Sequence, residues 1–288
     1  AQHLYVAQRR AGLDGEWRLT MRKYMKLLGA FFRVTFRTAT AYRSTYFAGI
    51  VGQWLGYGAT FATLFILTTR FENLGGWTPS EVLLLYGLAV LSYCIAATFF
   101  FNPTTFLSSK IRSGEFDAAL IKPLNPFVHE IFTGINPAYV SHFTLSMAII
   151  IYALITSGFH PSLWNITSMI FMVIGAIFVQ AAALVASSVM SFFTVNENPV
   201  LDFLLFNVKE FTNYPITIYP KAIQILLTFI LPFAFINFYP ASLLLGKAVP
   251  EGFPAVLPYL TPVVGIICFT LSVLLWNWGL KHYKSTGS

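Results

Sequence analysis

Charged side chains are scarce in this chain. They make up only 10% of its 288 residues, whereas an ordinary soluble domain carries about 25%. Hydrophobic residues make up 56%, and the mean hydropathy is +0.67. So few polar side chains cannot cover a globule of this size in water. The composition excludes an ordinary soluble domain and predicts an all-α polytopic membrane protein in a lipid bilayer.

Groups that catalysis or cofactor binding would need are also missing. The two cysteines, Cys94 and Cys268, lie inside apolar stretches and are better explained as small buried hydrophobic residues than as a disulfide or metal pair. No HExxH or GxSxG motif occurs. Beside the only Gly-Lys pair, Gly246-Lys247, alanines stand where a P-loop needs Gly and Ser or Thr. We expect no catalytic residue, metal or cofactor in this chain.

Six apolar stretches are long enough to cross a bilayer core, which takes about 20 residues per helix. Pro232 is expected to bend or break the fifth. The predicted spans are Tyr46–Thr68, Val82–Phe101, about Tyr139–Thr156, about Leu163–Phe193, Ala222–Tyr239 and Thr261–Leu280. Six spans place both chain ends on the same side of the membrane.

Basic residues predict which side that is. With the N-terminus inside, nine Lys or Arg before residue 44 and seven later ones, including Lys209 and Lys221, fall on the cytoplasmic side. Only Arg70 and Lys247 fall outside. This bias places both termini in the cytoplasm. The charges lie at the ends of apolar stretches, so the net charge of +7 does not indicate nucleic-acid binding.

Residues 1–23 form a polar tail, and 24–288 are predicted to form a single membrane domain. No cleaved signal peptide is expected, because the first long apolar run begins only near Tyr46. Residues 1–20 are interpreted as an upstream extension or a cloning remnant, since Met21 looks like a natural start.

Three segments outside the spans have informative patterns. Residues 24–43 place basic and apolar side chains on opposite faces, which predicts a helix lying in the membrane interface. Residues 199–213 show a similar amphipathic pattern and are expected on the cytoplasmic side. Residues 239–262 contain prolines at every fourth position from Pro250 to Pro262, which favours short re-entrant pieces on the outer side over a continuous helix.

The loop after the second predicted span, residues 102–126, concentrates charges and prolines. Asn102 as N-cap and Pro103 predict a short helix over 103–113, which Gly114 ends. A loop that only anchors topology needs basic residues alone. This one has both signs of charge, apolar side chains and a stiff return to the bilayer. The mixture favours a docking surface for a cytosolic partner over simple anchoring.

At this loop the chain resembles the permease subunits of bacterial type-2 ABC transporters, in the subfamily with a GxFDxxLxKPLxP signature after the second span. The dipeptide at 198–199 and the YPxxIYP stretch at 214–220 resemble that subfamily too. The signature is complete here in Gly114, Phe116, Asp117, Leu120, Lys122, Pro123, Leu124 and Pro126.

The resemblance implies an exporter in the bacterial inner membrane, with a second, identical or related permease and two copies of a cytosolic ATPase that carry ATP and Mg. It implies a cytoplasmic coupling element that moves as a lever, and a pathway at the dimer interface. The coupling residues expected are Phe106, Lys110, Arg112, Gly114, Glu115, Phe116, Asp117, Lys122 and Pro123. Candidate pathway or interface residues are Tyr214, Tyr219 and Gln224.

Two alternatives remain open. A non-transporting membrane scaffold would use the same loop to hold a cytosolic partner. An ion-coupled carrier is disfavoured because the predicted spans contain no carboxylate. The uncharged spans also favour an amphipathic cargo over a small ion. For Tyr214 and Tyr219, the residues themselves favour an anchoring role at the membrane interface over a role in the pathway.

Overall fold

The computed structural model describes residues 21–41, 43–70, 73–122, 124–159, 162–194 and 203–283. Within these ranges the chain is helical and forms no β-strand, apart from one isolated bridge between Leu74 and Trp77. The predicted tail up to residue 20 lies outside the described ranges. The all-α prediction is confirmed for the part of the chain that the structure describes.

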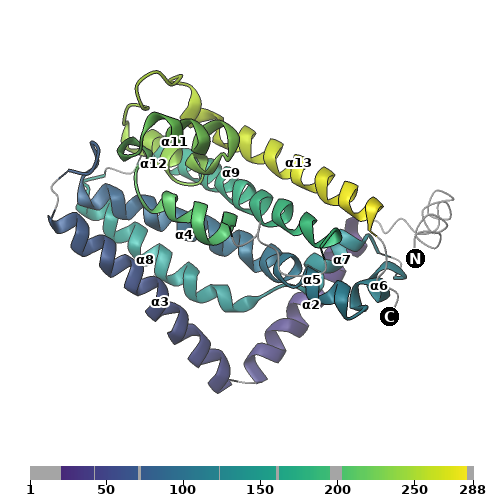
Figure 1. The fold of residues 1–288 in the computed structure, drawn as a ribbon. Coiled ribbons are helices and arrows are strands. Elements are labelled where there is room, and N and C mark those ends of the chain that lie inside the picture. Colours follow the sequence, from purple (N-terminus) through teal and green to yellow (C-terminus); the bar gives the residue numbers. More distant parts are fainter. Residues whose placement is uncertain are drawn as a thin grey trace.

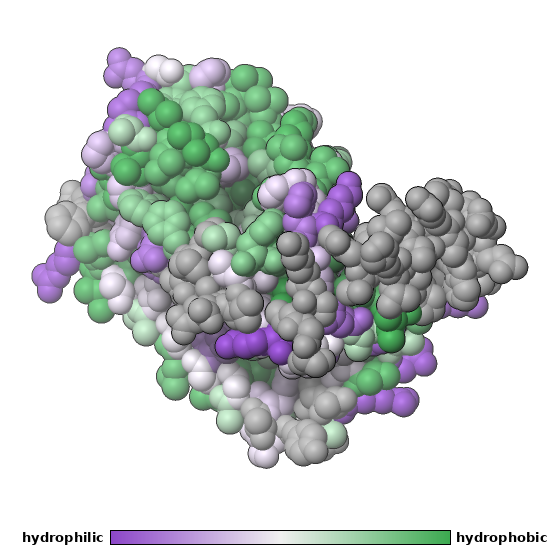
Figure 2. Space-filling view, turned by 45° about the vertical axis from the view of Figure 1, so that its right-hand side comes forward, coloured by the Kyte–Doolittle hydropathy of each residue, from purple (hydrophilic) through white to green (hydrophobic). Residues whose placement is uncertain are grey.

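Five long helices run roughly along one axis of the molecule (Figure 1). Each lies in an apolar segment long enough to cross a membrane, and broad hydrophobic areas cover the face seen in Figure 2. The chain is therefore a multi-pass membrane protein. The helices are α3 (Arg43–Arg70), α4 (Pro79–Thr105), α8 (Val140–Thr156), α9 (Leu163–Ser188) and α13 (Thr261–His282).

Helix α4 lies at the centre of the bundle, where it packs against α3, α8 and α9, and α13 packs along α9. In the most apolar part of α4, 83% of the residues are buried inside the protein. The corresponding share for α3 is only 6%. One whole side of α3 thus faces lipid or another subunit. Close approach of α9 and α13 requires a small residue, because a Cβ on Gly175 would lie 2.6 Å from the Thr261 carbonyl oxygen.

The expected fifth span, Ala222–Tyr239, is not a single helix. It consists of α11 (Lys221–Ile225), a π-helical turn η6 (Leu226–Ile230), a 3-10 turn η7 (Phe233–Phe235) and the start of α12 (Phe238–Leu245). The break falls at Leu231–Pro232, as predicted, since proline has no N–H for a helical hydrogen bond. Lys221–Ile230 spans about 15 Å, roughly half the bilayer core.

The placement of residues 199–213 on the cytoplasmic side is wrong for the part that is described, 203–213. The π-helix η3 (Phe203–Val208) packs against α9, and the 3-10 helix η4 (Lys209–Asn213) packs against α4. Val208 is 3% exposed. The apolar face of this segment is covered by protein instead of by a membrane interface. The chain then reaches the loop after α3, where Thr217 Oγ1 donates to the Gly75 carbonyl at 2.7 Å, beside η5 (Ile216–Ile218).

Lys221 also lies away from its predicted side. Its ammonium donates to the backbone carbonyl of Glu251 and lies 4.0 Å from the Phe253 ring centroid. Lys221 therefore lies at the same end of the bundle as Lys247, whose Nζ is 2.7 Å from Glu81 Oε2. Sixteen basic residues were assigned to the cytoplasmic side from the sequence. Two of them, Lys209 and Lys221, do not belong in that set. Lys110 and Arg112 remain at the opposite end.

Helix α2 (Met21–Ala41) confirms the predicted helix before the first span. Phe31 packs on Phe132 of α7 (Pro126–Thr133), with ring centroids 6.2 Å apart. The side chains of Lys26 and Arg33 are exposed, and Phe32 is exposed as well. Exposed basic and aromatic groups on one helix suit the membrane interface predicted for it.

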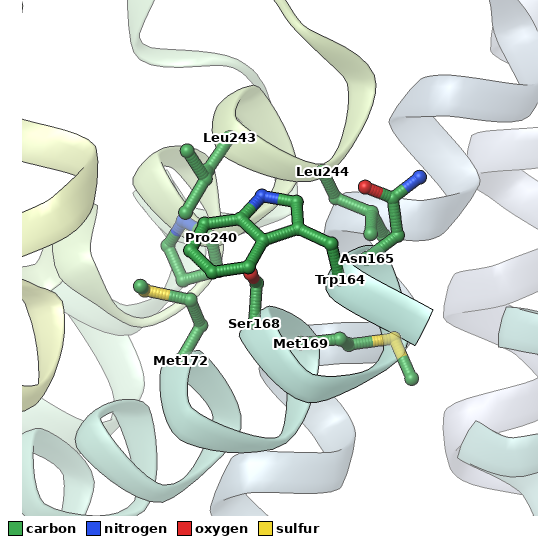
Figure 3. Close-up of a pocket in the computed structure, with 8 residues that line it drawn as sticks. All are labelled: Trp164, Asn165, Ser168, Met169, Met172, Pro240, Leu243 and Leu244. Carbon is green, nitrogen blue, oxygen red and sulfur yellow. The ribbon is translucent and has the colours of Figure 1, made fainter. Parts of the chain in front are cut away.

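The proline-spaced stretch 239–262 forms no continuous helix, as predicted. Helix α12 ends at Gly246, which has a positive φ of 64°, and the 3-10 turn η8 (Leu257–Leu260) leads into α13. Helix α12 packs against the start of α9, where the Trp164 ring lies beside Pro240 and Leu243 (Figure 3). The cavity between them is only about 10 Å³, so this contact is close to filled.

Candidate functional site

The loop after α4 folds into two short helices, α5 (Leu107–Arg112) and α6 (Glu115–Leu120). The predicted start of the first is wrong, because α4 continues through Pro103 to Thr105 and the Asn102 carbonyl accepts a helical bond from Phe106 N at 3.1 Å. The Pro103 ring is accommodated by Gly134, where a Cβ would lie 2.5 Å from Pro103 Cδ. The predicted end at Gly114 is confirmed; its φ of 74° favours glycine.

Phe116 holds α6 against the ends of two long helices. Its side chain is fully buried, with its ring centroid 5.7 Å from Phe192 and 5.4 Å from Tyr283. Phe192 in turn lies 5.3 Å from Trp276 of α13. Ser108 of α5 adds a 2.8 Å hydrogen bond to Ser191 in η2 (Val189–Phe192), the turn that extends α9. These contacts join α5 and α6 to both α9 and α13.

An internal ion pair joins α5 to α7. Lys110 Nζ lies 2.8 Å from Glu130 Oε2, and these side chains are only 17% and 5% exposed. Glu115 is more distant, at 3.9 Å from Lys110, and 68% exposed. Burial acts to raise the pKa of Glu130, but hydrogen bonds from His129 and Lys110 outweigh it and hold that pKa below its ordinary value. Lys110 therefore stabilises the loop after α4 through a largely buried ion pair.

The remaining predicted coupling residues divide by exposure. Phe106 is 50% exposed, and Arg112 and Glu115 are exposed as well. The exposed Lys122 places its Nζ 3.0 Å from His129 Nε2, and Asp117 Oδ1 accepts from the Tyr283 hydroxyl at 3.2 Å. Pro123 lies outside the described residues. The outward face thus combines an aromatic ring with both signs of charge.

A comparison with protein families decides what kind of protein carries this loop. The family model described as ABC-2 family transporter protein matches residues 55–287. The chain belongs to the ABC-2 transporter family. Comparison with curated proteins gives no significant match. Comparison with solved structures gives none either. An ABC-2 permease works with ABC ATPase subunits, to which the hydrolysis of ATP belongs.

In this ABC-2 permease the candidate pathway residues lie away from the loop after α4. Gln224 is buried, and its Nε2 donates to the Tyr219 carbonyl at 2.9 Å. The Tyr219 hydroxyl donates to the Phe211 carbonyl at 3.3 Å. Tyr214 is partly buried against the same core. The structure brings Gln224 and Tyr219 together near the end of the bundle that holds the loop after α3.

Several residues of the permease were missed by reasoning from the sequence. Glu130 is the last charged residue before a long uncharged stretch, and this position could have marked it as a candidate for an ion pair. The ring contacts of Phe116 left no such signal, because Phe192 and Tyr283 are far away in the sequence. The sequence interpretation also missed that Lys209 packs against Tyr93 of α4, in a cleft that the exposed Glu210 lines as well. In the described part of the chain no cluster of three or more potential metal ligands is found.

Proposed function

We propose that this chain is the membrane subunit of an ATP-driven exporter, paired with a second permease above two ATPase copies. The exposed face of α5 and α6, with Phe106, Arg112 and Glu115, docks the ATPase. The observation that carries the proposal is the burial of Phe116 between the ends of α9 and α13. A loop that only anchored topology would have no need of such a contact.

The contacts of the loop explain how a push on it would reach the bundle. Helix α5 follows directly on the central helix α4, so the two share a covalent connection. The Ser108–Ser191 bond and the Phe116–Phe192 contact pass displacement to α9. Tightly packed interiors transmit such shifts because they are close to incompressible. ATP and Mg, bound to the partner ATPase, would supply the free energy of that displacement.

The topology that supports this proposal passes through the membrane six times, with residues 203–219 as the fifth pass. Thr217 reaches the loop after α3, whereas Leu204 lies beside Ala186 near the other end of α9. The retained basic residues Lys110 and Arg112 favour a cytoplasmic location for the α5–α7 end.

Two other functions, an ion-coupled carrier and a non-transporting scaffold, compete with this proposal. The argument against an ion-coupled carrier was that the predicted spans contain no carboxylate. It is weakened, because the Glu210 carboxylate lines a cleft between α3, α4 and η4. The family match favours an ABC transporter all the same. A scaffold that merely holds a partner would bind an ATPase through the loop but would not change its hydrolysis rate.

The experiment compares two arginine reversals at opposite ends of the bundle. Arg112→Glu changes the outward face of α5, and Arg70→Glu changes an exposed site at the end of α3. Each variant is purified with its ATPase and assayed for ATP hydrolysis in lipid nanodiscs. We expect loss of co-purification or of lipid-dependent hydrolysis with Arg112→Glu alone. If both variants keep both properties, docking through this face is wrong.

A further inference from the structure

Away from the coupling loop, the bundle contains a cleft between its helices. The cleft has a volume of about 180 Å³ and is lined by three elements: α3, α4 and η4. Its lining residues are Gly56, Tyr57, Thr60, Tyr86, Ala89, Val90, Tyr93, Lys209, Glu210 and Asn213. Tyr57 stands near the middle of the apolar segment Tyr46–Leu67. The cleft therefore lies close to the middle of the membrane.

A lysine ammonium occupies the wall of this cleft. Lys209 Nζ lies 3.5 Å from the centroid of the Tyr93 ring and 5.6 Å from that of Tyr57. Rings attract a cation through their negative faces, and this explains how the charge is tolerated there. A charged residue at this depth is costly and usually serves a function.

None of the salt bridges in the described part of the chain includes the Lys209 ammonium, although the adjacent Glu210 carboxylate attracts it from a greater distance. The neighbouring Glu210 uses Oε2 to accept from Asn213 Nδ2 at 2.7 Å. His142 is another titratable group close by, and the centroid of its ring lies 4.2 Å from that of Tyr57. A cation that packs on two rings and forms no salt bridge can pair with an incoming anion.

We propose that this cleft binds the anionic head group of an amphipathic molecule, with Lys209 as the counter-charge and Tyr57 and Tyr93 as the walls. Sites for drug-sized ligands are about 300–1,000 Å³, so a volume of about 180 Å³ admits a head group and not a whole amphiphile. Gly56 and Glu210 are exposed at the rim, where the apolar body would leave the cleft toward α3.

The proposal rests on the proposed function only in naming the bound molecule as cargo. Binding itself is independent of the ATPase, and it is tested without hydrolysis. If labelling occurs as expected but no ATPase associates, the transport role fails and the site stands. If the ATPase associates and labelling does not occur, the site fails alone.

The test uses three photoactivatable probes with the same alkyl chain: a fatty acid, its methyl ester and a trimethylammonium analogue. Each is cross-linked to the purified protein in phosphatidylcholine nanodiscs, and labelled peptides are mapped. The fatty acid should label residues 56–60, 86–93 and 209–213 at least about tenfold more than the ester, since a charged hydrogen bond contributes about 1.5–3 kcal/mol. Equal labelling by the ester, or stronger labelling by the cation, would overturn the proposal.

Variants at Lys209 separate the effect of its charge from the effect of the shape of the cleft. Lys209→Met should reduce fatty-acid labelling to the level of the ester, Lys209→Arg should retain it, and Lys221→Met, at the end of the bundle, should leave it unchanged. If Lys209→Met does not fold, the comparison of probes on the unmodified protein still decides. Excess decanoate should displace the fatty-acid probe, whereas inorganic phosphate should not. Equal displacement by phosphate would show a site for free anions and contradict the assignment to an amphiphile.

Discussion

Lys110 and Glu130 are twenty positions apart in the sequence, yet Nζ of one lies 2.8 Å from Oε2 of the other. The pair joins α5 to α7 beneath the exposed face of the loop after α4, and both side chains are largely buried. Removing one member of a buried pair leaves an uncompensated charge, which costs more than removing both.

We predict that Lys110→Met and Glu130→Gln each lower the free energy of unfolding by about 3–5 kcal/mol, whereas the double variant loses clearly less than the sum. The measurement is thermal or denaturant unfolding in detergent micelles. Arg112→Met, on the exposed side of the same helix, serves as the control and should change stability by about 0.5 kcal/mol at most. Additive losses would show that Lys110 and Glu130 do not interact.

The same pair predicts a pH dependence. The pKa of Glu130 in the folded protein lies below its ordinary value of 4.5. The stabilisation from its ionised form is therefore complete above the unfolded-state pKa and is lost as the pH falls through the folded-state pKa. The stability difference between the unmodified protein and Glu130→Gln should stay constant from about pH 7 to pH 6 and shrink below about pH 4.5. A difference that grows on acidification would contradict this sign.

The topology of the fifth pass predicts the side on which Lys221 lies. In a background of Cys94→Ser and Cys268→Ser, Lys221→Cys should react with a membrane-impermeant maleimide from the same side as Arg70→Cys. Arg112→Cys should react from the other side only. If Lys221→Cys instead reacts from the same side as Arg112→Cys, the cytoplasmic assignment of Lys221 made from charge alone is correct. The fifth pass is then refuted.

The contact between α9 and α13 predicts a steric effect at Gly175. A methyl group there would lie 2.6 Å from the Thr261 carbonyl oxygen, a backbone atom that cannot rotate away. Gly175→Ala should therefore destabilise the bundle by about 1–3 kcal/mol. Gly49→Ala is the matched control, because nothing lies within 4 Å of that site; it should stabilise α3 by about 0.5–1 kcal/mol. Unfolding in detergent measures both, and equal effects would rule out close packing at Gly175.

The sequence predicted the long helices well, because a run of about 20 apolar residues without charge matches the length of a helix that crosses a bilayer. It also identified Gly114 as a helix end, since a glycine there is a local signal. The prediction failed for Ala222–Tyr239, where Pro232 was recognised as a break but the remaining pieces were still counted as one span. It gave no sign that Lys110, expected among the coupling residues, pairs with the buried Glu130.

What the sequence determined by itself is the environment of the chain: its scarcity of charge requires lipid, and its apolar runs require helices. Only the tertiary structure decided where the amphipathic segment 203–213 lies. Its periodicity shows that one face is apolar, but an apolar face is satisfied equally by a membrane interface or by α4 and α9. Packing against those helices carried Lys209 to the rings of Tyr57 and Tyr93, and no local pattern in the sequence encodes that contact.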